Sequence, residues 1–219
     1  MTIRRRDFLA SLGGVSLAGL HPLSAREASA AIITPVDDTW DVTWTDKLKG
    51  KYRAVFDSPG FSDGAALFRS VIWSRQHKAI YGTAAEELNA VLVVRHQGIW
   101  LALNDAFWKK YTVGKRKKFK DGKGQFYGHN PIGSAAPGAP PDFAEMNIPS
   151  FTAKGGIVLA CNLAFAEVVS TVEKEEKIST AEADKLARTY LLPGVILQPS
   201  GVFAVLRAQE VGCHYILAS

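Results

Sequence analysis

The sequence is poor in residues that bind metals or form disulfides. Its 219 residues include two cysteines, five histidines and two methionines. It contains no C-x-x-C or H-x-x-x-H spacing and no dense cluster of histidine and aspartate, so we predict that no metal is bound. No G-x-G-x-x-G pattern follows an apolar segment, which disfavours dinucleotide binding. The sequence thus predicts a protein without a cofactor.

Long apolar segments are also lacking. The apolar segment at residues 8–20 contains three glycines and is shorter than a bilayer requires. It follows three arginines at positions 4–6, and residues 28–30 read Ala-Ser-Ala, a cleavage pattern. We therefore predict a twin-arginine signal peptide over residues 1–30, cleaved near Ala30, and a periplasmic protein with no membrane span. A plain amphipathic helix or an uncleaved anchor is the alternative interpretation.

Removal of residues 1–30 would leave 22 basic and 19 acidic residues, so the net charge would fall from +5 to +3. A mildly basic, exported protein is not expected to bind nucleic acid. The remaining length is enough for one domain with a full hydrophobic core. Residues 31–50 alternate aromatic and polar side chains, which indicates a short edge strand or an arm laid over that domain.

The C-terminal segment contains the clearest secondary-structure pattern. Residues 195–197 are apolar, and the strand at residues 195–198 ends before Pro199, which cannot donate to a sheet. Ser200 stands where a helix N-cap belongs, and Gly212 is a natural helix stop. An apolar strand at residues 213–217 follows. Two strands joined by one helix form a right-handed parallel crossover.

The same alternation extends upstream. Further strands are expected at residues 52–56, 91–95 and 157–160, and helices at 63–81, 97–111, 162–174 and 179–190. A further turn has its cap at Thr83. We predict a three-layer α/β domain over residues 51–219, with five mostly parallel strands and helices on both faces. Residues 112–150 lack periodicity and form a basic insert rich in glycine and proline, which is functional or mobile.

Residues 191–217 read LLPGVILQPSGVFAVLRAQEVGCHYIL, and this segment resembles the C-terminal signature of the DsrE/DsrF/TusD-like sulfur-relay family. The resemblance extends to residues 156–165 and, more faintly, to the strands at 52–56 and 91–96. It implies a small α/β domain that associates as a homo-oligomer, often a trimer or hexamer. It also implies that the persulfide-carrying cysteine of the family corresponds to Cys161.

Cys161 is the main candidate for a reactive group. It directly follows a predicted strand and precedes a predicted helix at Asn162. A thiol at a helix N-terminus meets the positive end of the helix dipole and free N–H groups, which favour the thiolate. The alternative is a structural cysteine buried among Leu159, Leu163 and Phe165, since free cysteine is often fully buried. Both interpretations stay open.

Cys213 is the second thiol, and two cysteines in an exported protein ordinarily form a disulfide. Cys161, however, closes a strand at its carboxyl end, whereas Cys213 opens one at its amino end. Across a parallel sheet these ends are several residues apart, at about 3.3 Å per residue, which exceeds disulfide reach. We predict two free thiols, with Cys213 buried and inert.

Polar residues near the expected carboxyl edge of the sheet complete the candidate site. His96 and Arg95 end a strand and could bind an anion or poise the thiolate, although a single histidine at a strand end is commonly structural. Further candidates for substrate binding are Asn104, Asn162 and His129. The eight cations between Lys109 and Lys123 could attract a small anionic ligand or an acidic partner, or could form a solvated loop.

These observations support two hypotheses. In the first, the protein carries sulfur on Cys161 as a persulfide, or binds a small sulfur compound there, and exchanges it with a donor or acceptor protein. In the second, the protein is a non-catalytic module for small-ligand binding or oligomeric assembly on the same fold. A redox enzyme is a weaker option, because no second cysteine near Cys161 could resolve a disulfide. Whether the protein is an enzyme stays open at this point.

Overall fold

The computed structural model describes residues 40–135, 138 and 140–219. The predicted signal peptide over residues 1–30 and its cleavage site lie outside these described residues. Within them, no helix combines the length and the apolar character needed to cross a membrane.

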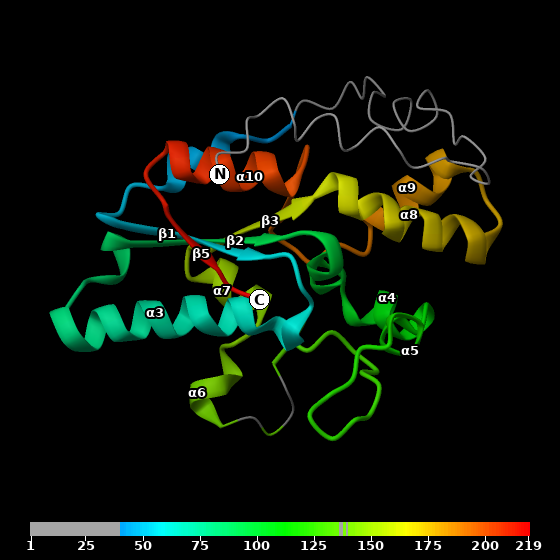
Figure 1. Ribbon diagram of the computed structural model, residues 1–219, viewed down its shortest axis with the longest axis horizontal. Coiled ribbons are helices and arrows are strands. Elements are labelled where there is room, and N and C mark those ends of the chain that lie inside the picture. The colour runs from blue at the N-terminus through cyan, green and yellow to red at the C-terminus, as the bar shows by residue number, and fades with distance from the viewer. Residues whose placement is uncertain (1–39, 136–137, 139) are drawn as a thin grey trace, which may run out of the picture. The chain divides into compact units, whose positions relative to one another are not determined.

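A five-stranded parallel sheet forms the middle layer of the described chain, which confirms the predicted α/β fold (Figure 1). The strands follow the order β4-β3-β2-β1-β5, and every neighbouring pair is parallel. Because all strands run the same way, their carboxyl ends meet at one edge. The strands are β1 (Tyr52–Ser58), β2 (Leu88–Val94), β3 (Ile157–Cys161), β4 (Val195–Gln198) and β5 (His214–Leu217).

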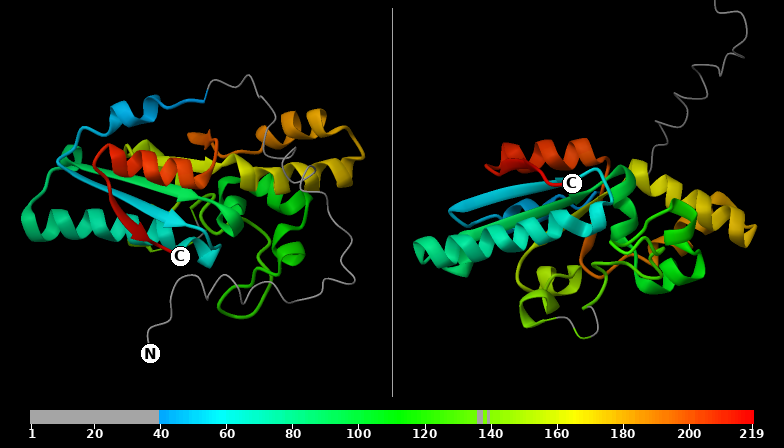
Figure 2. Two further views of the ribbon diagram at one scale, coloured as in Figure 1. Left: turned by 45° about the horizontal axis from the view of Figure 1, so that its top comes forward. Right: turned by 60° about the horizontal axis from the view of Figure 1, so that its bottom comes forward.

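Strand side chains alternate between two buried clusters, one on each face of the sheet. In β2, Val91 and Val93 pack in the cluster that includes α10 (Gly201–Glu210), whereas Leu92 packs in the larger cluster on the other face. Figures 1 and 2 show α10 on one side of the sheet and α3 (Ala65–Tyr81) on the other. A sheet buried on both faces explains why its strands are continuously apolar.

Three connections pass over the face opposite α10, and α10 alone returns the chain to the far edge of the sheet (Figure 2). This arrangement keeps all the crossovers right-handed. Besides α3, the connecting helices are α4 (Asp105–Lys110), α5 (Val113–Lys117), α6 (Pro141–Ala144), α7 (Ile148–Ala153), α8 (Asn162–Glu176) and α9 (Thr180–Arg188). Four short 3-10 segments join them: η1 (Thr43–Lys47), η2 (Ser62–Gly64), η3 (Ala85–Glu87) and η4 (His96–Ala102).

Two predicted helix caps are confirmed and a third is displaced by one residue. The Ser200 hydroxyl accepts a hydrogen bond from the Phe203 N–H at 3.0 Å, and Ser179 forms a capping box with Glu182. The predicted cap at Thr83 is wrong. The N-cap residue is Ala84 instead, and its N–H donates a hydrogen bond to the Glu87 carboxylate. The turn itself is the 3-10 segment η3.

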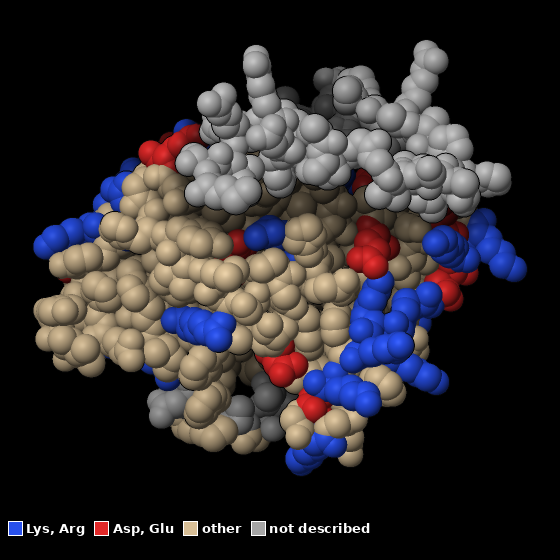
Figure 3. All heavy atoms as spheres, in the orientation of Figure 1, with Lys and Arg blue, Asp and Glu red and all other residues tan. Residues whose placement is uncertain are grey.

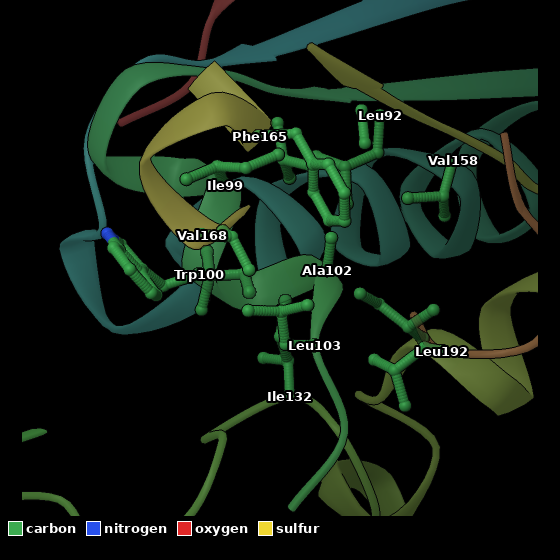
Figure 4. Close-up of a cluster of buried hydrophobic side chains, with 14 of the residues drawn as sticks. Leu92, Ile99, Trp100, Ala102, Leu103, Ile132, Val158, Phe165, Val168 and Leu192 are labelled. Carbon is green, nitrogen blue, oxygen red and sulfur yellow. The ribbon is translucent and has the colours of Figure 1, made fainter. Parts of the chain in front are cut away.

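The predicted helix over residues 97–111 is also wrong. Residues 96–102 form the 3-10 segment η4, and a separate helix, α4, begins at Asp105. The physical reason is burial. Ile99 to Leu103 are all at most 1% exposed, whereas the amphipathic helix expected here would bury one face and leave the other exposed. All five belong to one buried cluster, and Figure 4 shows Ile99, Ala102 and Leu103 beside Phe165 and Val168 of α8.

The described residues of the insert at 112–150 are more ordered than the sequence suggests. It contains α5, α6 and the start of α7. Asn130 anchors it to the core, because its fully buried amide donates to the carbonyls of Leu101 and Leu103 at 2.8 and 2.7 Å. The ring of Phe119 stacks on Phe61 at 3.9 Å between centroids. The insert is therefore packed against the domain at several points.

The described part of residues 31–50 lies over the domain as an arm and forms the 3-10 segment η1 rather than an edge strand. Trp44 is fully buried in the cluster below α10. Its indole N–H donates to the side-chain oxygen of Gln198 at 3.2 Å, and the Gln198 amide donates to the Asp41 carbonyl at 2.7 Å. These bonds tie the arm to the end of β4.

Candidate functional site

Cys161 occupies the position predicted for it, at the carboxyl end of β3 and the start of α8. Its side chain caps the helix: the Sγ atom accepts a hydrogen bond from the Ala164 N–H at 3.4 Å. Ile157 and Leu159 of the same strand pack in the cluster that includes α10. By strand alternation, the thiol of Cys161 points to this same face.

A hollow of about 380 Å³ leads to Cys161, although the residue itself is only 7% exposed. Three chain segments meet there. They are the turn after β2 with Arg95, His96 and Gln97, the start of α8 from Cys161 to Glu167, and the start of α10 with Ser200, Gly201 and Val202. The hollow thus lies between two helix N-termini, where backbone N–H groups favour anions.

His96 is brought to the same hollow as Cys161 by a tight turn. Its backbone has a positive φ of 46°, and its side chain is exposed. Two residues later, Gly98 donates its N–H to the Arg95 carbonyl at 2.8 Å. A Cβ atom on Gly98 would lie 2.3 Å from the Ser58 carbonyl oxygen. Only glycine allows the turns after β1 and β2 to pack this closely.

Arg95 is fixed by a buried ion pair that sequence reasoning missed. Its Nε and a terminal nitrogen each donate to one carboxylate oxygen of Asp57 at 2.8 Å. The Asp57 side chain is 2% exposed and that of Arg95 is 21% exposed. The hydrogen bond to Asp57 raises the pKa of Arg95 above its usual value, with burial acting in the opposite direction. Arg95 is therefore a permanent, oriented cation beside the hollow.

Tyr215 completes this group from the last strand. Its hydroxyl donates to the second carboxylate oxygen of Asp57 at 3.0 Å. Burial raises the pKa of the Tyr215 hydroxyl, and the hydrogen bond to Asp57 raises it further. Asp57 thus holds Arg95 and Tyr215 together, and the three line a second hollow of about 250 Å³ beside the first. Asp57 directly follows the strand predicted at residues 52–56, so the reasoning from the carboxyl edge that was applied to Cys161 also applies to Asp57.

Gly201 allows the Arg95 side chain to lie against the first turn of α10. A Cβ atom on this glycine would stand 2.5 Å from Cδ and 2.6 Å from Cβ of Arg95. The absence of a side chain at this position therefore lets the cation pass between the turn after β2 and the helix. The geometry of the Cys161 hollow depends on this close approach.

The other sequence candidates lie outside the residues that line this hollow. Asn104 caps α4, where its side-chain oxygen accepts from the Phe107 N–H at 3.0 Å. Asn162 is the first residue of α8 and is half-buried. His129 is exposed in the insert, where its ring lies edge-on to Tyr127. The 3-10 segment η4 explains the position of Asn104, because it interposes a turn between β2 and α4.

Cys213 is separated from Cys161 by the strands β2 and β1, and both thiols are free. Cys213 is buried in the cluster with α10, and burial raises its pKa to about 11. It is therefore protonated at neutral pH and cannot serve as a resolving thiol for Cys161. In the described part of the chain, no group of three or more metal-ligating side chains occurs.

Several cations of the predicted basic run are paired within the domain. Lys110 bonds Glu176 at 2.8 Å, Arg116 bonds Glu175 at 2.5 Å, and Lys117 bonds Glu167, all on α8. Figure 3 shows the Lys and Arg side chains crowded over the region of α4 and α5, with acidic side chains beside them. The pairs of Arg116 and Lys117 fasten the insert to α8, and that of Lys110 joins α4 to α8. Glu167 also lines the Cys161 hollow.

Comparison of the chain with protein-family models found no match, and comparison with curated proteins found none either. The resemblance to the sulfur-relay family consequently depends on the sequence segments quoted above.

Asp57 provides a direct test of this arrangement. We expect Asp57→Asn to lower the free energy of unfolding by about 2 kcal/mol, because hydrogen bonds to charged groups contribute about 1.5–3 kcal/mol. The matched control is Asp184→Asn, which removes the carboxylate paired with Arg188 on the surface of α9. That change should cost about 0.5 kcal/mol or less. Urea unfolding measures both, and equal losses would contradict the role of Asp57 as an anchor.

Proposed function

We propose that this protein carries sulfur as a persulfide on Cys161, or binds a small sulfur compound at that thiol. The observation that supports this proposal most is the placement of Cys161. It lines an accessible hollow at the carboxyl edge of a parallel sheet, with the Ala164 N–H directed at its sulfur. Reactive groups of open α/β proteins gather at this edge. The resemblance to the sulfur-relay family assigns the same role to the same residue.

The chemistry requires the thiolate form of Cys161. The thiolate attacks the outer sulfur of thiosulfate, an S–S bond forms, and the S–S bond of thiosulfate breaks to release sulfite with the bonding electron pair. The product is a persulfide anion on Cys161, so charge and atoms balance. The N-terminus of α8 stabilises both the thiolate and the persulfide anion of Cys161. A polysulfide donor reacts in the same way, and the leaving group is a polysulfide that contains one sulfur atom fewer.

Two neighbouring side chains have distinct parts in this proposal. Arg95 is a fixed cation next to the hollow and attracts an anionic sulfur donor, although Asp57 offsets much of its charge. His96 is exposed on the rim of the hollow and, when protonated, favours the thiolate and the leaving anion. The partners are then a small anionic sulfur compound, or a donor or acceptor protein that presents such a group.

A mass measurement tests the proposal. The purified protein is incubated with thiosulfate or polysulfide, and its intact mass is read without a reductant. We expect the mass of one sulfur atom to be added to the wild type and to Cys213→Ser, but not to Cys161→Ser. An adduct that persists in Cys161→Ser, or no adduct on the wild type, would contradict the sulfur-carrier role and favour the binding or assembly module.

The second candidate, an assembly module, is favoured by a different observation. Large apolar side chains are exposed on α10 and β5, next to the hollow with Asp57. Val202 is 61% exposed, Leu206 53% and Leu217 59%. Exposed apolar residues gathered on adjacent elements commonly mark an interface. A homo-oligomer that uses this surface would bring another copy close to the hollow of Cys161, and the two candidate functions are compatible.

Native mass spectrometry tests the assembly. We expect the wild type to form a homo-oligomer and Leu206→Lys to shift it toward the monomer, because an exposed apolar side chain is replaced by a charge at an interface. Ile80→Lys is the matched control, since Ile80 is also exposed but lies at the far end of α3. A monomeric wild type at micromolar concentration would rule out the assembly role.

We also propose that the protein is exported to the periplasm by the twin-arginine route. The arginines at positions 4–6, the short apolar segment and the Ala-Ser-Ala sequence support this proposal. When the full chain is expressed in a bacterium, the periplasmic fraction should contain a product that begins at Ala31. Replacing Arg5 and Arg6 with Lys should keep the uncleaved chain in the cytoplasm. An uncleaved wild-type chain in the cytoplasm would contradict export.

A further inference from the structure

A separate hollow of about 350 Å³ lies at the opposite edge of the sheet from Cys161. It opens at the amino ends of β2 and β3, between α3 and α7, which Figure 1 shows on the same side of the sheet. Its floor is apolar and includes Val71, Leu88, Ala90 and Phe151. Ala90 and Phe151 are themselves part of the main buried cluster. The floor is thus an extension of the hydrophobic core that remains open to solvent.

Charged side chains surround this hollow. Arg75 and Lys78 project from α3, Lys154 follows α7, and Glu145 follows α6. The Glu145 carboxylate bonds the Lys154 ammonium and lies 3.8 Å from the Arg75 guanidinium. Lys154 lowers the pKa of Glu145, so this side chain is ionised at neutral pH. Arg75, Lys78 and Lys154 therefore line the apolar hollow together with Glu145, and the Glu145 carboxylate pairs with Arg75 and Lys154.

The combination is selective for a particular ligand chemistry. Among the described residues that line the hollow, three are cations and one is an anion, which disfavours an amine and favours an anion. An apolar floor favours a hydrocarbon or aromatic tail, and the volume falls within the range of about 300–1,000 Å³ that is typical of small-molecule sites. The Glu145 carboxylate already occupies the place between two cations that a ligand carboxylate would take.

We propose that this hollow binds a small amphipathic carboxylate, whose tail lies on the apolar floor and whose carboxylate replaces that of Glu145 beside Lys154 and Arg75. Glu145 then acts as an internal competitor. Because Glu145 directly follows α6, its release removes the ion pairs that join this part of the insert to Arg75 of α3 and to Lys154 after α7, while the stacking of Phe143 on Phe68 remains. The site is independent of the sulfur chemistry proposed for Cys161, since the two hollows lie at opposite edges of the sheet.

Calorimetric titration with octanoate tests the proposal on the full chain. Octanol has the same tail without the charge, and acetate has the charge without the tail. We expect octanoate to bind more tightly than either. Glu145→Gln should tighten octanoate binding about tenfold, because it removes the carboxylate that competes for Lys154. Lys154→Met should weaken octanoate binding about tenfold, because it removes a cation that would bond the ligand carboxylate.

Two further variants make the result specific to this hollow. Ala85→Trp, at an exposed position on its rim, should block octanoate without disturbing the core. Lys174→Met on α8 removes one exposed cation at a distance and should leave binding unchanged. Cys161→Ser should bind octanoate as the wild type does, so failure of the sulfur role would not affect this outcome.

The proposal is overturned if neither the wild type nor Glu145→Gln binds octanoate at millimolar concentration. It is also overturned if octanol binds as tightly as octanoate and Lys154→Met has no effect, because the hollow would then be an apolar cavity without anion recognition. Binding that survives Ala85→Trp would place the ligand elsewhere on the protein and would likewise contradict the assignment.

Discussion

The buried ion pair between Asp57 and Arg95 is the interaction on which the candidate site depends. It joins the end of β1 to the turn after β2 and includes the hydroxyl of Tyr215 from β5, so three segments far apart in sequence meet on one carboxylate. A buried carboxylate is tolerated only when its oxygens are fully paired. Once this pair is in place, the Arg95 side chain must lie against the first turn of α10, where Gly201 leaves room for it. The hollow that leads to Cys161 forms between these elements.

The parallel sheet gives its two edges different chemistry. At the carboxyl edge, the N-termini of α8 and α10 face the thiol of Cys161, and oriented N–H groups stabilise negative charge there. At the amino edge, long cationic side chains from α3 and after α7 surround an apolar floor. The first arrangement suits a covalent step at sulfur, and the second suits reversible binding of an apolar anion. The insert contacts both, because Lys117 bonds Glu167 and Glu145 bonds Lys154.

Local patterns in the sequence predicted the strands, most helices and the position of Cys161, because each depends on neighbouring residues. Ser200 and Ser179 act as caps through bonds to residues three positions away. Long-range contacts decided the remainder. Ile99 to Leu103 are all buried in one cluster with residues of α8 and of the insert, which are distant in sequence. Tyr215 likewise bonds to Asp57 across 158 positions. No single-sequence pattern connects such residues. Asp57 could nonetheless have been predicted, because it directly follows a predicted strand, as Cys161 does.

The proposed role requires that Cys161, but not Cys213, is a reachable and reactive thiol in the folded protein. Alkylation of the native protein with iodoacetamide near neutral pH, followed by peptide mapping over time, tests this claim most directly. We expect Cys161 to be modified in the folded protein, whereas Cys213, whose pKa is raised to about 11 by burial, should be modified only after unfolding. Modification of Cys213 first, or of neither thiol until the protein unfolds, would exclude a reactive Cys161.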